Sequence, residues 1–221
     1  MIALGALSTQ THALTPFQAS YQFLYNGKNM GSATRTLKHT AGDNWSYNFS
    51  AKAGVLASAN ENSTFALSNG KIISNQFSRS SKVLVHNNTL NIKFNPSSKV
   101  ISTKKDSTAR SFAWKPGALD ELNAELQLRE DLQKSGLKSN YLIADAKGLD
   151  TRKFVKLGTE NVKTPYGTFS AIKVRLEHSK PERNTIFWLA PKLDYAPVKV
   201  THNDGGSSYG LLITSYKDSA N

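Results

Sequence analysis

Apolar residues alternate with polar ones along most of the chain. In the stretch FQASYQFLY, residues 17–25, aromatic residues and one alanine occupy every second position. A period of two places these side chains on one face of a half-buried β-strand. The following Asn26-Gly27 pair tolerates positive φ and favours a tight hairpin. The pattern therefore predicts a strand and then a turn.

The same pattern recurs up to residue 114. Its predicted strands are MGSATRTLKHT, WSYNFSAKA, STFALS, KIISNQFSRS, KVLVH, TLNIKF, KVISTKK and TARSFAW. Turns are expected at Asn69-Gly70 and at Asn87-Asn88. Since parallel strands need long crossovers, strands joined by such tight turns indicate an antiparallel meander.

The second half returns to strands. They are predicted at NYLIADA, TRKFVKLG, ENVKT, TFSAIKVRLEH, RNTIFWLA, APVKVTH and SYGLLITSY. About a dozen strands in all exceed what one flat sheet carries, so the sheet should curl. We expect a mainly β protein with a large curved antiparallel sheet, forming a half-barrel or an open barrel.

One segment has helical spacing instead. Leucines recur at positions 119, 122 and 126, acidic residues come early, and Gly136 suits the position after a helix end. This predicts one α-helix around residues 119–134. Further leucines at 128 and 132 fall on another side, so the helix should be covered on more than one face, lying across an opening of the curled sheet.

The domain organisation follows from these elements. Residues 14–218 should form a single β-rich domain, since no long polar linker divides them. Residues 1–13 combine a short apolar stretch with Thr11-His12-Ala13, a small-x-Ala pattern typical of a cleavage site. We interpret residues 1–13 as the remnant of an export signal, with a flexible N-terminus as the alternative.

The charge is strongly positive, with 28 Lys+Arg against 16 Asp+Glu and a formal net charge of +12. Between residues 71 and 115 the basic residues face only one acid, Asp106, whereas the predicted helix is acidic and should partly neutralise them. The excess favours an anionic neighbour such as a membrane surface, with a solvated surface as the alternative. Nucleic acid is not expected, because only the charge supports it.

Catalytic and metal-binding patterns are weak. Ser208 lies in a G-x-S-x-G motif, but a strand follows it and no histidine comes later, so we interpret the motif as a hairpin loop. The histidines lack metal-ligand spacing, no cysteine is present, and phosphate-binding glycine loops are missing. Glu121 and Glu125 are expected to be surface charges, with Glu125 pairing with Arg129. We predict no catalytic residue, metal or cofactor.

The stretch RNTIFWLAPKLDYAPVKV, residues 183–200, reads as a hairpin arm. Both faces of its first strand are apolar, as expected of a strand covered on each side. Arg175, Arg183 and Trp188 are the predicted ligand-binding residues. The arginines would hold an anionic or sugar head group by bidentate hydrogen bonds, and Trp188 would stack on it. The alternative is a core tryptophan with solvated arginines.

Four stretches stand in order along nearly the whole chain after the first residues: FQASYQFLYNGKNMGSATRTL, ALDELNAELQLREDL, FVKLGTENVKTPYGTFSAIKVRL and RNTIFWLAPKLDYAPVKV. Together they resemble the bacterial DUF3108 family, a domain of unknown function. The resemblance implies an exported envelope protein of Gram-negative bacteria without established catalytic residues. By architecture, the Trp-containing hairpin is also similar to those of LolA-like half-barrels, which hold lipid acyl chains on a concave sheet.

These observations favour a non-enzymatic periplasmic protein that binds a lipid-like or glycan ligand. The alternative is a hydrolase of an envelope polymer, whose carboxylates would come from four acids that the fold brings together. Those acids are Glu160, Glu177, Asp194 and Asp204. A third class is a protein-interaction module that uses exposed strand edges. The sequence leaves the oligomeric state open.

Overall fold

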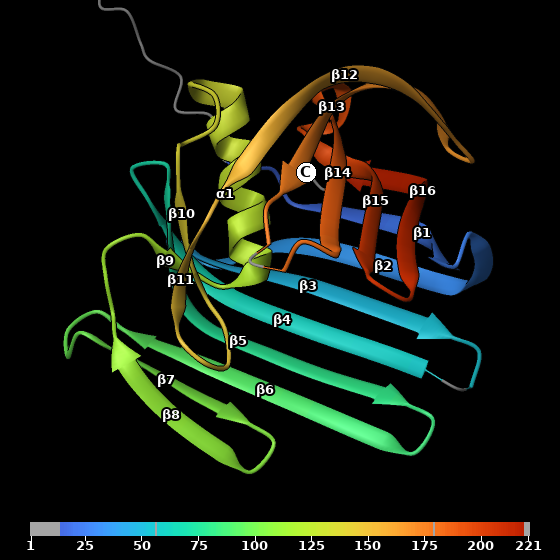
Figure 1. Cartoon of the computed structure of the whole chain (residues 1–221). Coiled ribbons are helices and arrows are strands. Elements are labelled where there is room, and N and C mark those ends of the chain that lie inside the picture. The colour runs from blue at the N-terminus through green and yellow to red at the C-terminus, as the bar shows by residue number, and fades with distance from the viewer. Residues whose placement is uncertain (1–13, 56, 179, 219–221) are drawn as a thin grey trace, which may run out of the picture.

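A computed structural model describes residues 14–55, 57–178 and 180–218. The predicted export-signal remnant, residues 1–13, lies outside the described residues. Thirteen strands form one antiparallel sheet in the order β12-β13-β14-β15-β16-β1-β2-β3-β4-β5-β6-β7-β8. The sheet curves strongly without closing into a barrel, as Figure 1 shows. The predicted mainly β fold with an open, curved sheet is confirmed.

The sheet consists of two meanders. The first contains β1 Phe17–Tyr25, β2 Lys28–Ala41, β3 Asn44–Ala53, β4 Ala57–Ser68, β5 Lys71–Val83, β6 His86–Asn95, β7 Val100–Lys105 and β8 Thr108–Ala113. The second contains β12 Phe154–Thr164, β13 Gly167–Leu176, β14 Arg183–Ala190, β15 Ala196–Asp204 and β16 Ser208–Asp218. The first and last strands of the chain join them, with Phe17 opposite Asp218 and Tyr25 opposite Tyr209.

The helix α1, Glu121–Lys134, lies against the concave face of this sheet (Figure 1). Large buried side chains such as Tyr47, Phe65 and Phe77 alternate with polar ones along the strands and form the inner face. A second, three-stranded sheet of β9 Ala118–Leu119, β10 Tyr141–Ala144 and β11 Leu149–Arg152 also contacts the helix through β10. The helix is therefore covered on more than one face, as predicted.

Several details of the strand prediction were wrong. TRKFVKLG and ENVKT are not two strands, because residues 151–152 belong to β11 and residues 154–164 form the single strand β12. Residues 82–86 do not form a separate strand before an Asn87-Asn88 turn; the chain turns at Leu84-Val85, and both asparagines lie in β6 opposite Lys82 and Ser81. The register of β5 and β6 is fixed by buried inward residues such as Phe77 opposite Ile92, which outweighs the local turn preference. The second sheet also departs from the antiparallel rule, because β9 and β10 are parallel.

Candidate functional site

The helix carries a polar face that is buried inside the curved sheet. Between Leu122 and Asp131 every helix residue is buried, including six that are polar or charged: Asn123, Glu125, Gln127, Arg129, Glu130 and Asp131. The prediction of surface carboxylates at Glu121 and Glu125 was wrong for Glu125, and Glu125 does not pair with Arg129. The sheet curls around the helix, so these polar groups meet polar groups of the inner face rather than water.

The central contact of this face is an ion pair across the core. The Arg35 guanidinium on β2 lies 2.8 Å from Glu125 Oε2, and both side chains are less than a tenth exposed. The Tyr47 hydroxyl donates to Glu125 Oε1 at 2.7 Å and accepts from Arg35 at 3.3 Å. Burial raises the pKa of Tyr47 well above its usual range, so the hydroxyl stays protonated. The helix is thus held to β2 and β3 by a closed polar triangle.

Asp120 forms a second buried contact at the start of the helix. Its carboxylate caps the helix by accepting from the Asn123 backbone N–H at 3.0 Å. It also accepts from the Ser63 hydroxyl of β4 at 2.7 Å and from the Asn123 side chain at 2.8 Å. Asp120 is fully buried, and burial raises its pKa from 3.8 to about 6 despite these donors. Asp120 is therefore a buried acid that titrates near pH 6.

This pKa gives a pH-dependent term in stability. The folded state binds the Asp120 proton more tightly than the unfolded state, so this term stabilises at low pH and is lost as the pH rises from about 4 to about 6. Asp120→Asn, which keeps a helix cap, removes the term. The unfolding free energy of the wild type relative to the variant should fall by about 2–3 kcal/mol across that window. Urea titrations at several pH values measure it; parallel profiles would contradict it.

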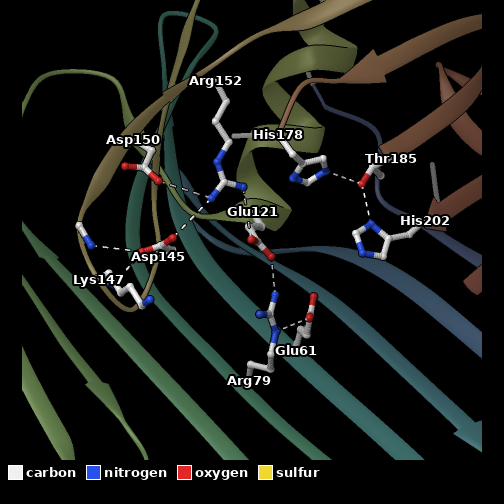
Figure 2. A network of polar contacts seen from close by, with 11 residues as sticks. Glu61, Arg79, Glu121, Asp145, Lys147, Asp150, Arg152, His178, Thr185 and His202 are labelled. Atoms are coloured by element: carbon white, nitrogen blue, oxygen red, sulfur yellow. Dashed lines mark hydrogen bonds and ion pairs between the residues drawn. The ribbon is translucent and has the colours of Figure 1, made fainter. Parts of the chain in front are cut away.

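Charged residues gather around the N-terminal end of the helix, as Figure 2 shows. Glu121 Oε2 lies 2.5 Å from Arg79 on β5, and its other oxygen lies 3.7 Å from Arg152 on β11. Arg79 also binds Glu61 at 2.6 Å. The Glu121 side chain is 42% exposed, and although its packed surroundings work against ionisation, Arg79 outweighs them and lowers the pKa of Glu121. For Glu61 burial prevails and raises the pKa. The helix acid thus neutralises part of the basic sheet, as predicted.

Two histidines lie beside this cluster and share one hydroxyl (Figure 2). Thr185 Oγ1 lies 2.8 Å from His178 Nε2 and 2.7 Å from His202 Nδ1. Burial lowers the pKa of both imidazoles, and the neighbouring His202 ring lowers the pKa of His178 further. Both shifts disfavour the charged imidazolium, and hydrogen bonding to Thr185 holds the orientation of the two rings. No group of three metal-ligating side chains occurs within the described ranges.

A cavity of about 660 Å³ opens where the helix ends. It lies between the loop after α1, the start of β12, and parts of β13 and the β14–β15 connection. Its lining residues are Leu132, Gly136, Leu137, Lys138, Ser139, Asn140, Lys153, Phe154, Val155, Lys156, Ile172 and Tyr195. We call it the lysine cavity, because three lysines stand over an otherwise largely apolar wall and no lining residue is acidic.

The charges of the lysine cavity are only partly neutralised. Lys138 lies 3.2 Å from Asp131, which also accepts from the Tyr141 hydroxyl at 2.8 Å. Lys153 and Lys156 have no ion-pair partner among the described residues, and both are exposed. An apolar wall with cations at its margin is the chemistry that holds the tail and head of an anionic amphiphile.

Sequence reasoning missed this cavity, because its lysines come from separate parts of the chain. Lys153 and Lys156 do flank the apolar pair Phe154-Val155, and Lys138 follows Leu137. A lysine next to an apolar residue in each of two segments was the available signal. Which segments would meet depended on the curl of the sheet.

A second hollow of about 310 Å³ lies on β3, β4, β5 and β6. Most of its lining residues are small and polar. They alternate with the inward residues Phe49, Glu61 and Arg79, so they point away from the helix. Examples are Asn48, Asn60, Asn62, Ser78, Ser80 and Asn91. Amides and hydroxyls suit sugar hydroxyls, but no aromatic residue on this outer face provides a stacking platform within the hollow.

The three predicted ligand-binding residues do not form a common site. Trp188 faces outward from β14, is 5% exposed, and lies between Lys173 at 5.1 Å and Lys199 at 4.4 Å from its ring. Arg175 on β13 pairs with Glu177, just after the end of that strand, at 3.4 Å. Arg183 begins β14, five residues before Trp188. None of the three lines either cavity. Their role in ligand binding stays a prediction.

The four acids proposed for hydrolysis also have separate partners. Glu160 accepts from the Trp188 indole N–H at 2.6 Å and pairs with Lys173 at 3.2 Å. The Trp188 hydrogen bond, and after it Lys173, lowers the pKa of Glu160. Glu177 pairs with Arg175, and Asp194 ends the short helix η1 Pro191–Leu193 in a left-handed conformation. Asp204 ends β15. Neither of the two cavities described above is lined by a carboxylate pair.

An open antiparallel sheet wrapped around one helix, with a cavity at the end of that helix, defines a barrel-like β protein. A family model described as "Protein of unknown function (DUF3108)" matches residues 17–209. The chain belongs to the DUF3108 family, which confirms the resemblance. Among the described residues, no helix is long and apolar enough to span a membrane.

A solved structure shares the fold. The chain is similar to a beta-barrel-like protein of a domain of unknown function, DUF1849, from Brucella abortus, with a TM-score of 0.59 and 13% sequence identity. The alignment covers 93% of this chain and 98% of that one. No curated protein sequence matches the chain significantly. At this level of identity the likeness concerns the architecture alone.

Proposed function

We propose that the protein is a non-enzymatic binding protein of the cell envelope whose ligand is an anionic amphiphile held in the lysine cavity. The observation that carries this proposal is the composition of the cavity wall. Leu132, Leu137 and Ile172, which are only partly buried, offer apolar surface. Lys153 and Lys156 stand beside it without an acidic partner among the described residues. A volume of about 660 Å³ lies in the range of ligand pockets.

The direct test is calorimetric titration with two ligands that share one tail. Palmitate carries a negative charge, whereas 1-palmitoylglycerol is neutral. The cavity should bind palmitate about tenfold more tightly, since one charge-assisted contact contributes roughly that factor. Equal affinities for palmitate and 1-palmitoylglycerol would mean that the lysines do not contribute to binding. No binding of either ligand would contradict the proposal. Binding to a glycan array instead would favour the outer hollow on β3–β6.

Export to the periplasm is part of the same proposal. It is supported by the apolar residues 2–7, by the small-x-Ala pattern at residues 11–13, and by the exported character that the family resemblance implies. Fractionation of the natural host tests it with an antibody against the chain. Recovery with periplasmic markers supports export, and recovery with cytoplasmic markers contradicts it. A hydrolase is less well supported, because neither described cavity holds a carboxylate pair.

A further inference from the structure

At one end of the sheet, the turns that join neighbouring strands expose aliphatic side chains to water. At the β3–β4 turn Val55 is 96% exposed, and at the β5–β6 turn Leu84 is 57% and Val85 84% exposed. The two turns lie side by side, because Ala57 at the start of β4 pairs with Val83 at the end of β5. In Figure 1 both hairpins project at the same side of the molecule. We call this cluster the aliphatic edge.

The residue types in the aliphatic edge are unusual for tight turns. Two-residue hairpin turns favour glycine, asparagine and aspartate, and Leu84 adopts a φ of 56°, which a bulky residue rarely does. The chain places Asn26-Gly27 and Asn69-Gly70 at two other turns of the same sheet, so suitable residues occur where they serve folding alone. Strain together with exposed apolar surface in one short segment points to a contact outside the fold.

The same edge is lined with lysines. Because consecutive strands are antiparallel, the turns after β1, β3, β5 and β7 all lie at one end of the sheet. Five lysines stand within three residues of these turns: Lys28, Lys52, Lys82, Lys104 and Lys105. None of them has an ion-pair partner among the described residues. The acid of these turns, Asp106, accepts the Thr89 N–H.

We propose that the aliphatic edge docks on the surface of an anionic lipid bilayer. Val55, Leu84 and Val85 would enter the interface between head groups and acyl chains, while the surrounding lysines would lie near lipid phosphates. Protruding aliphatic tips ringed by cations match both forces that bind proteins at such an interface. Protein interfaces instead concentrate tyrosine, tryptophan and arginine in a packed patch, and none of these occurs at the two turns.

Flotation of the full chain with lipid vesicles tests this proposal. Vesicles of phosphatidylcholine with phosphatidylglycerol are compared with vesicles of phosphatidylcholine alone. Leu84→Gly/Val85→Asn removes both aliphatic side chains and supplies residues that suit a turn with positive φ at its first position, so the fold should be retained. Lys52→Glu/Lys82→Glu reverses two charges. Ile73→Thr is the matched control, because Ile73 is 38% exposed on β5 at the opposite end of the sheet.

We expect binding to the anionic vesicles only, weakened about tenfold or more by either double variant and unchanged by Ile73→Thr. Thermal unfolding verifies that each variant is folded. Absence of wild-type binding would overturn the proposal, as would full binding by Leu84→Gly/Val85→Asn, which would mean attraction by general charge alone. Capture of an envelope protein by the same edge, without vesicle binding, would also overturn it. Because the lysine cavity shares no residue with this edge, failure here leaves the proposed ligand site unaffected.

Discussion

Replacing Glu125 with alanine should lower the free energy of unfolding by about 3–5 kcal/mol. The substitution leaves the Arg35 guanidinium buried at 7% side-chain exposure without its anion, and it removes the acceptor of the Tyr47 hydroxyl. An uncompensated charge in such a position costs far more than the loss of an exposed ion pair. Urea unfolding followed by tryptophan fluorescence measures the change.

Two further variants separate the buried charge from simple loss of volume. Glu130→Ala breaks a pair on the same helix whose cation, Lys134, is 40% exposed, and should cost about 1 kcal/mol. Arg35→Met/Glu125→Leu removes both charges and should recover much of the stability lost in Glu125→Ala. If Glu125→Ala costs no more than Glu130→Ala, the core ion pair does not hold the helix to the sheet.

Reversing two charges of the lysine cavity should abolish most of its affinity for anionic amphiphiles. Lys153→Glu/Lys156→Glu places repulsion where we propose attraction, and the affinity for palmitate should fall about 100-fold, roughly tenfold for each lysine. Both side chains are exposed, so the fold should be little affected. Calorimetric titration gives the affinities of the variant and the wild type.

The control must carry the same change in net charge. Lys93→Glu/Lys99→Glu also lowers the formal charge by four, from +12 to +8, and neither residue lines the lysine cavity. It should bind palmitate like the wild type at moderate salt, where distant charges are screened. An equal loss in both double variants would mean that net charge, rather than the cavity, attracts the ligand.

Local patterns predicted the elements of this fold well. The alternation in residues 17–25 became β1, the Asn26-Gly27 and Asn69-Gly70 pairs became turns, and the helix fell within the predicted range. The pairing of β1 with β16 could not be predicted, because Tyr25 and Tyr209 are far apart in sequence and nothing local links them. Long-range pairing depends on the whole sheet.

The buried face of the helix is the clearest failure of local reasoning. Glu125, followed by Arg129 four residues later, has the appearance of a surface ion pair. Yet Glu125 binds Arg35, and Arg129 donates to the Asp194 carbonyl oxygen at 3.0 Å. Only the curl of the sheet, which brings polar inner residues of β2 and β3 to the helix, explains why charged residues are buried there.

The lysine cavity does not contain the residues that the sequence predicted for ligand binding. The sequence favoured a lipid-like or glycan ligand held by Arg175, Arg183 and Trp188, and that role stays a prediction. The structure places Trp188 between two lysines on the outer face and assembles the lysine cavity elsewhere. Residues such as Lys138 and Lys156 are brought together by the path of the chain after the helix, which no local pattern encodes.

The central claim, that the lysine cavity binds an anionic amphiphile, is tested most directly by methyl NMR. The full chain, labelled at isoleucine, leucine and valine methyl groups, is titrated with dodecyl phosphate below its micelle concentration. We predict saturable shifts at Leu137, Val155 and Ile172, which line the cavity, and none at Ile73 or Ile186 on the outer face. Shifts confined to residues outside the cavity, or no saturable shift at all, would contradict the claim.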